Sequence, residues 1–283
     1  MGVNSNKKLN LLIVLLLTMA LSLSSCSSNR SQSEITDVND LKGKTIAVKM
    51  GFDSDYHFSK FKDINVVRYN TSADMLLAMK NKYVDAIAGT KIENNFITQV
   101  STGVKVLPEP AAEFGNVFAV ANEDAELLNE LNEFLIEFKK TDEYSDIVRR
   151  FEEATVYEYE TKDIPLTGTG KTIVLVMDPA EYPFSFYDYE DEAYRGIEIE
   201  IISSFANKMN YKLEFIQDSA TMVQQHFINN TADIGACDFS DVYKEEAEMA
   251  DVYKLSEPYY IDEITLLVPD ETGDYSLDEE LDF

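Results

Sequence analysis

The chain has 283 residues, of which 24 are Lys or Arg and 52 are Asp or Glu, so its formal net charge at pH 7 is −28. A hydrophobic fraction of 45%, with 16 Tyr and 16 Phe, is enough for a packed core and excludes a wholly disordered chain. The excess of acid argues against a nucleic-acid partner, because such binding depends on Lys and Arg neutralising phosphates.

The first 25 residues carry two Lys and no acid, and their apolar run from Leu9 to Leu23 predicts a signal peptide. The run is shorter than the roughly 20 residues that a membrane-spanning helix needs, so a permanent N-terminal anchor is the less favoured alternative.

The signal sequence ends in Leu23-Ser24-Ser25-Cys26, which resembles the lipobox of bacterial lipoproteins, where the Cys becomes the lipidated first residue. We therefore expect lipidation at Cys26, a flexible Ser-rich tether over residues 26–37, and an extracytoplasmic protein anchored to the cell membrane. The second cysteine, Cys237, lies in an apolar stretch and is expected to be a core residue rather than a catalytic thiol.

From residue 41 the chain alternates strand-like and helix-like segments, which predicts an α/β fold with mainly parallel sheets. In the first block the strands are expected over 44–49, 64–69 and 84–88, with a helix from Thr71 or Ser72 to Lys82. A strand over 116–121 and helices over 125–139 and 142–153 follow. The second block is expected to have strands over 171–176, 213–216 and 232–237, with helices over 197–209 and 221–230.

Four ordered elements of the second block resemble a known family. They are YPFSF from Tyr182, GIEIE from Gly196, ADIG from Ala232 and LSEPYY from Leu255, similar to the P-P-F-x-Y, G-F-D-V-D, V-D-x-I and F-S-x-P-Y-Y elements of the bacterial extracellular solute-binding proteins, family 3. The first block is similar to the family's other end, through DLKGKTIAV from Asp40 and YVDAI from Tyr83.

The resemblance implies a type II periplasmic-binding-protein-like fold, with two α/β lobes joined by hinge strands, in circularly permuted order. Permutation of one folded body is favoured over a fragment of a tandem array, because 283 residues supply one set of parts. The expected segments are a second-lobe-like domain (38–115), the returning strand and closing helices of the first lobe (116–158), a linker (159–170), the first-lobe domain (171–268) and an acidic tail (269–283).

Both charge clamps that the family uses for a free α-amino acid are absent from the matching positions. Val242 and Glu245 stand where the family has a Thr and the Arg that pairs with the α-carboxylate, and Thr90 stands where it has an Asp for the α-ammonium. Acids near Asp238 and Glu245 would repel a carboxylate, so a cation such as a polyamine, a basic peptide or a quaternary amine fits better. The ligand-binding residues expected from the alignment are Asp53, Ser54, Thr90, Glu181, Tyr182, Phe184, Asp238 and Ser240.

The resemblance implies a monomeric, membrane-tethered solute-binding lipoprotein that captures an amino-acid-like, polyamine or peptide ligand. It would deliver that ligand to an ABC permease or report it to a sensor partner, without catalysis, cofactor or metal. The alternatives are a scaffold that has lost its ligand and binds another protein, and a dehydratase-type enzyme on the same fold. Positive signs of an enzyme are weak, since the two His residues lie far apart in sequence and no nucleophile or phosphate-loop motif occurs.

Overall fold

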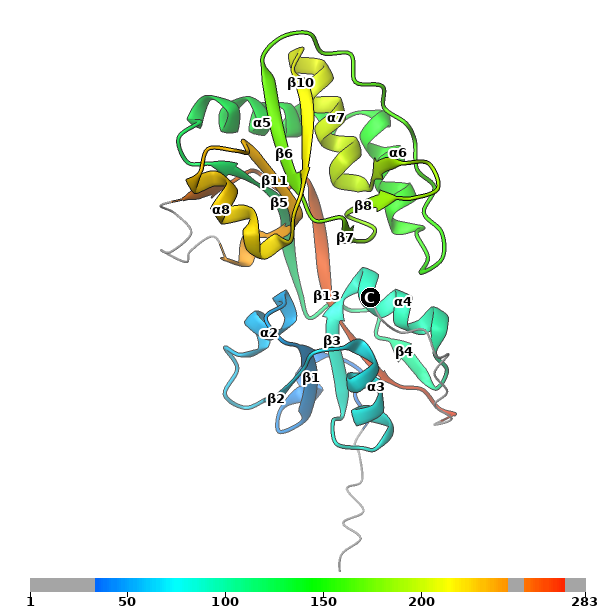
Figure 1. Ribbon diagram of the computed structural model, residues 1–283. Coiled ribbons are helices and arrows are strands. Elements are labelled where there is room, and N and C mark those ends of the chain that lie inside the picture. Colours follow the sequence, from blue (N-terminus) through cyan, green and yellow to red (C-terminus); the bar gives the residue numbers. More distant parts are fainter. Residues whose placement is uncertain (1–33, 244–251, 273–283) are drawn as a thin grey trace, which may run out of the picture. The chain divides into compact units, whose positions relative to one another are not determined.

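A computed structural model of the chain describes residues 34–243 and 252–272 (Figure 1). The predicted signal peptide, Cys26, Glu245 and most of the acidic tail lie outside these residues, so those predictions stay predictions. No helix in the described part of the chain is long and apolar enough to cross a membrane.

The first block folds around a central parallel strand. β1 (Thr45–Lys49) pairs in parallel with β2 (Asn65–Tyr69) on one side and with β3 (Ala86–Thr90) on the other. The helices of this N-terminal half are α2 (Asp53–Phe58), α3 (Ser72–Lys80) and α4 (Lys91–Val100), and a 3-10 turn, η1 (Val38–Leu41), precedes them.

The second block repeats this plan. β6 (Thr172–Met177) pairs in parallel with β10 (Lys212–Gln217) and with β11 (Ile234–Ser240). The helices of this C-terminal half are α5 (Ala125–Phe138), α6 (Asp142–Glu152), α7 (Ile197–Met209) and α8 (Val223–Ile228), with the 3-10 turns η2 (Ala220–Met222) and η3 (Asp241–Tyr243). A small antiparallel sheet is formed by β7 (Ala180–Glu181), β8 (Ser185–Asp188) and β9 (Ala193–Arg195).

Two long strands join the halves. β5 (Ala112–Ala121) pairs with β11, β13 (Tyr260–Pro269) pairs with β3, and β5 and β13 pair with each other, all antiparallel. β12 (Tyr253–Leu255) and β4 (Val104–Val106) add antiparallel edges. The sheet therefore runs β10-β6-β11-β5-β13-β3-β1-β2 (Figure 1). The expectation of a mainly parallel sheet was wrong at its centre, because the chain passes from one half to the other along β5 and returns along β13.

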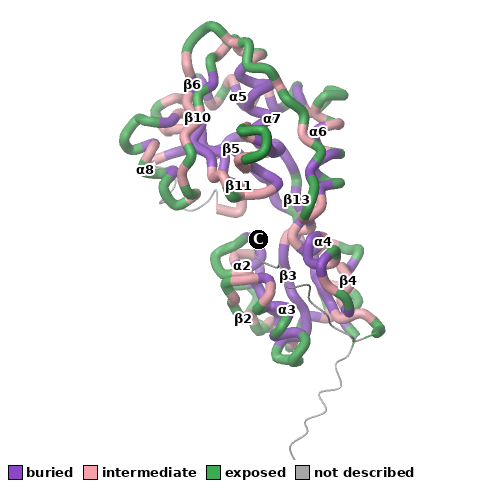
Figure 2. The backbone as a smooth tube through the Cα atoms, turned by 45° about the vertical axis from the view of Figure 1, so that its right-hand side comes forward, coloured by how far each residue is buried: buried purple, intermediate pink, exposed green. Residues whose placement is uncertain are grey.

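The apolar core follows these strands. Figure 2 shows that most residues along β5 and β13 are buried. Among them are Val117, Phe118, Leu266 and Leu267. In the C-terminal half α5 and α6 pack on α7, where the Phe134 and Phe205 ring centroids lie 5.4 Å apart. Burial of such apolar surface is the dominant stabilising term in this half.

Buried charge also links these helices. The Arg150 guanidinium on α6 is 1% exposed and makes two hydrogen bonds to the Glu200 carboxylate on α7, at 2.7 and 2.5 Å. Two further donors contact the Asp146 carboxylate and the Glu160 carbonyl oxygen. A bidentate pair with further hydrogen bonds loses less free energy on burial than a pair with a single contact does.

Helix starts follow the caps that the sequence supplies. The Thr71 hydroxyl accepts a hydrogen bond from the Asp74 amide at the start of α3, and Thr141 does the same for α6. The predicted helix over 197–209 matches α7, and the predicted first-block strands are found within two residues of their expected starts. The helices α2 and α4, the small sheet and β13 were not predicted.

Candidate functional site

One small cavity draws its lining from both halves of the sheet. It has a volume of about 160 Å³. Three of the residues predicted to bind ligand, Asp53, Glu181 and Asp238, line it together. The other lining residues are Gly51, Phe52, Ala220, Cys237 and Tyr243. No basic side chain is found among these described lining residues.

Asp53 is the first residue of α2, just after the Gly51 turn, whose φ of 81° suits glycine. Asp53 is only 6% exposed, and in the described structure its Oδ1 atom has no hydrogen-bond partner. Burial raises the pKa of Asp53 to about 6; the Ser240 hydroxyl opposes this shift, while the nearby charges of Asp241 and Glu93 reinforce it. This carboxylate is therefore buried at a cost that its own surroundings do not offset.

Asp238 reaches the cavity through an irregularity in β11. The pairing of β11 with β5 shifts register between Gly235 and Phe239, and Asp238 adopts the left-handed conformation with φ 51°. The Oδ1 atom of Asp238 accepts a hydrogen bond from the side-chain amide of Asn116 at 2.7 Å. Burial, followed by the negative charges of neighbouring carboxylates, holds the pKa of Asp238 well above its usual range.

Two further buried carboxylic acids, Glu198 and Asp262, lie near enough to Asp238 for their charges to raise its pKa, and neither was predicted from the sequence as a site residue. Glu198, in the first turn of α7, accepts hydrogen bonds from the Asp238 amide and the Tyr259 hydroxyl, and burial raises its pKa to about 8. Burial also raises the pKa of Asp262 on β13 to about 7. The available signal was an acid inside an apolar run, as in Gly196-Ile197-Glu198-Ile199.

Glu181 on β7 has a cation in its neighbourhood. Burial and the charge of Asp178 raise the pKa of Glu181, and the charge of Lys49 opposes them. The Lys49 ammonium lies 4.3 Å from the centroid of the Phe52 ring, a cation–π contact at the wall of the cavity.

The five other predicted site residues lie apart from the lining. The Tyr182 hydroxyl donates to the Thr155 carbonyl oxygen at 2.7 Å, and Phe184 is buried in the apolar core. Ser54 is buried in α2, whereas the Ser240 hydroxyl is buried beside Asp53. The Thr90 hydroxyl caps α4 by accepting from the Glu93 amide at 3.2 Å.

Two features bear on catalysis and metal binding. Burial raises the pKa of the Cys237 thiol, which disfavours the thiolate that a nucleophile needs. Within residues 34–243 and 252–272, no group of three or more His, Cys, Asp or Glu side chains is arranged to hold a metal ion.

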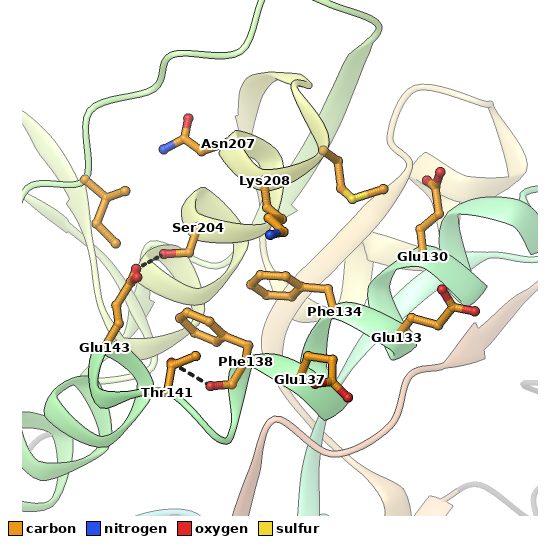
Figure 3. A pocket seen from close by; sticks show the side chains of 12 residues that line it. Glu130, Glu133, Phe134, Glu137, Phe138, Thr141, Glu143, Ser204, Asn207 and Lys208 are labelled. Carbon is orange, nitrogen blue, oxygen red and sulfur yellow. Dashed lines mark hydrogen bonds between the residues drawn. The ribbon is translucent and has the colours of Figure 1, made fainter.

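A second hollow, of about 690 Å³, lies between α5, α6 and α7 in the C-terminal half alone (Figure 3). The stacked rings of Phe134 and Phe138 line it, with ring centroids 4.7 Å apart. The acidic side chains of this hollow have partners or are exposed to solvent. Glu143 points toward Ser204 and accepts a hydrogen bond from its hydroxyl at 2.6 Å, and Glu137 forms an ion pair with Lys140. Unlike the small cavity, this hollow presents no buried carboxylate without a partner.

Residues 173–277 match the model of the bacterial extracellular solute-binding proteins, family 3. Over this segment the chain is similar to the family-3 solute-binding proteins. The match contains the four elements from which the resemblance was drawn, so the family prediction is confirmed there. Together with the observed sheet, it confirms a mixed α/β fold of the type II periplasmic-binding-protein kind. The family consists mostly of binding proteins that work outside the cytoplasm with ABC transporters.

Several solved structures are similar to this chain. A phosphate-binding protein of a phosphate ABC transporter from Streptococcus pneumoniae TIGR4 is 11% identical over 81% of this chain and 89% of that one, with a TM-score of 0.40. The probable amino-acid ABC transporter extracellular-binding protein ytmK from Bacillus subtilis is 8% identical over 82% and 87%, with a TM-score of 0.40. A glycine betaine/carnitine/choline ABC transporter structure is 9% identical over 81% and 80%, with a TM-score of 0.42. No curated protein matches the chain.

Proposed function

We propose that this chain is a solute-binding protein that captures a small cationic ligand between the halves of its sheet for an ABC permease. The observation that carries the proposal is the carboxylate of Asp53, which is buried and has an oxygen without a partner in the described structure. Asp53 lines the same cavity as Asp238 and Glu181. Burying an unpaired charge costs several kcal/mol or more, so proteins pair such groups. A bound cation supplies the missing partner.

The same lining disfavours an ordinary α-amino acid. Its α-carboxylate would enter a cavity whose described walls hold three carboxylates and no cationic side chain. The Arg that the family resemblance supplies for this group is replaced in the sequence by Glu245. A ligand with positive charge and no carboxylate avoids this repulsion.

Charge couples binding to closure of the two halves. Asp53 comes from the N-terminal half and Asp238 from the C-terminal half, and the negative charge of Asp53 is among the causes that raise the pKa of Asp238. When the halves approach without a ligand, these like charges repel each other. A cation between them turns the repulsion into two attractions, so ligand binding favours the closed arrangement.

We also propose the anchor and the lobe order that the sequence predicts. Lipidation of Cys26 would hold the protein at the membrane beside its permease. The permuted order is supported by the position of the family match, which begins at residue 173, after the whole N-terminal half. A sensor role in place of transport would use the same capture step.

A thermal-shift screen tests the proposed function. We expect amines and polyamines to raise the melting temperature of the purified protein, because a ligand that binds only the folded state stabilises it, by about 2.7 kcal/mol at 100 times Kd. Amino acids should shift it much less. A folded, monodisperse sample that responds to none of these compounds would support the alternative of a scaffold without a small ligand.

A substitution in the lining then tests whether the amine found in the screen binds in this cavity. We expect Glu181→Gln to weaken the amine that binds severalfold, since Glu181 lines the cavity and Gln keeps the shape of the side chain but removes the negative charge that attracts a cation. Glu190→Gln is the matched control, because Glu190 is exposed in the loop between β8 and β9. Equal affinities for the Glu181 variant and the unchanged protein would remove Glu181 from the site.

A further inference from the structure

The cavity's charges bear on how many positive charges its ligand carries. Each of the three lining carboxylates comes from a different element: Asp53 from α2, Glu181 from β7 and Asp238 from β11. Of the charges that act on Glu181, that of Asp178 raises its pKa and that of Lys49 opposes it less strongly, so Glu181 has a cation nearby. The charges that act most strongly on Asp53 and Asp238 are all negative, so these two carboxylates are left without a counter-charge in the described structure.

We propose that the ligand is a small dication with two separated charges, a short alkyl diamine, whose ammonium groups pair with Asp53 and with Asp238. This inference rests on the proposed function and narrows its ligand class. The unpartnered Oδ1 of the buried Asp53 side chain marks one ammonium position. Asp238, held by the Asn116 amide and facing the same cavity from the other half, marks the second.

The shape of the site distinguishes a diamine from a divalent metal ion. A metal ion needs three or more ligand atoms converging within coordination distance, and the described His, Cys, Asp and Glu side chains form no such group. The cavity of about 160 Å³ also exceeds the space of one ion. At about 30 Å³ of liquid volume per water molecule it would hold roughly five waters, which is comparable to a chain of four carbons with two nitrogens.

The test compares two amines of equal chain length, 1,4-diaminobutane and n-butylamine, by calorimetric titration of the purified protein at pH 7.5. We expect the diamine to bind at least tenfold more tightly. Asp53→Asn should weaken the diamine and bring its affinity close to that of butylamine. Asp63→Asn, which removes an exposed carboxylate just before β2, should leave both affinities unchanged and so controls for overall charge.

The outcomes separate this inference from the proposed function. If both amines bind with equal affinity, the dication is overturned while cation capture stands. If neither binds to folded protein but the wider screen of amines and polyamines finds a ligand, the short diamine is overturned and cation capture stands. If that screen also finds none, the proposed function itself fails. If Mg²⁺ binds at least as tightly as the diamine and its binding is lost in the Asp53 variant, the ligand is a metal ion and the diamine is overturned.

Discussion

Replacing Asp53 by Asn is expected to stabilise the ligand-free protein at pH 7.5 by about 3 kcal/mol while weakening its binding of cations. The Asp53 carboxylate is almost fully buried, and its pKa is raised from 3.8 to about 6. Asn keeps the size of the side chain and carries no charge, so the folded state no longer holds an ionised group away from water. The carboxylate that we propose to bind the ligand therefore lowers the stability of the ligand-free protein.

The stabilisation should depend on pH in a definite direction. Because the folded protein binds this proton more tightly than the unfolded chain, Asp53 lowers stability as pH rises from about 4 to about 6. Below this window both states are protonated and the variant should match the unchanged protein. Above it the full difference is present.

Urea unfolding of both proteins at pH 4, 5, 6 and 7.5 measures this difference. Asp63→Asn serves again as the control, since its exposed carboxylate should change stability little at any of these pH values. A constant offset between Asp53→Asn and the unchanged protein, or none at pH 7.5, would contradict the burial of an ionised Asp53.

Replacing Arg150 by Met is expected to destabilise the protein by about 3–5 kcal/mol, because it leaves the Glu200 carboxylate buried without its partner. The pair joins α6 to α7 through two hydrogen bonds, at 2.7 and 2.5 Å, and both residues are buried. The double variant in which Glu200 is also replaced by Met should recover most of this loss, because two apolar side chains leave no uncompensated charge.

The neighbouring residue provides a close control. Arg149 makes ion pairs with Asp146 and Glu153, but its side chain is 45% exposed. Pairs of this kind contribute about 0–1 kcal/mol, so Arg149→Met should change the free energy of unfolding only slightly. Chemical denaturation of the four proteins tests the prediction, and equal losses for the two Arg variants would show that burial of the pair matters less than we infer.

The fold could be predicted where local pattern decides structure. The helix Ile197–Met209 has an apolar face and a left-handed Asn210 after its end, and both signals are local. β13 was missed because its position depends on two partners far away in the chain, β3 and β5. The small sheet was missed because strands of two to four residues carry too little alternation to be recognised.

The site was predictable only in part, for a similar reason. The alignment supplied Asp53, Glu181 and Asp238, which the structure brings to one cavity. It also supplied Phe184, an aromatic residue that the structure places in the core. Glu198 and Asp262 could not be chosen from so many acids, because burial distinguishes them and burial is set by tertiary packing.

A crystal structure of the protein grown with 1,4-diaminobutane shows directly where the ligand binds. We expect the diamine in the cavity between the halves of the sheet. One of its nitrogens should lie within hydrogen-bonding distance of the Asp53 carboxylate and the other within that distance of the Asp238 carboxylate. A diamine bound only in the hollow between α5, α6 and α7, or a cavity that stays without the diamine at saturating concentration, would contradict it.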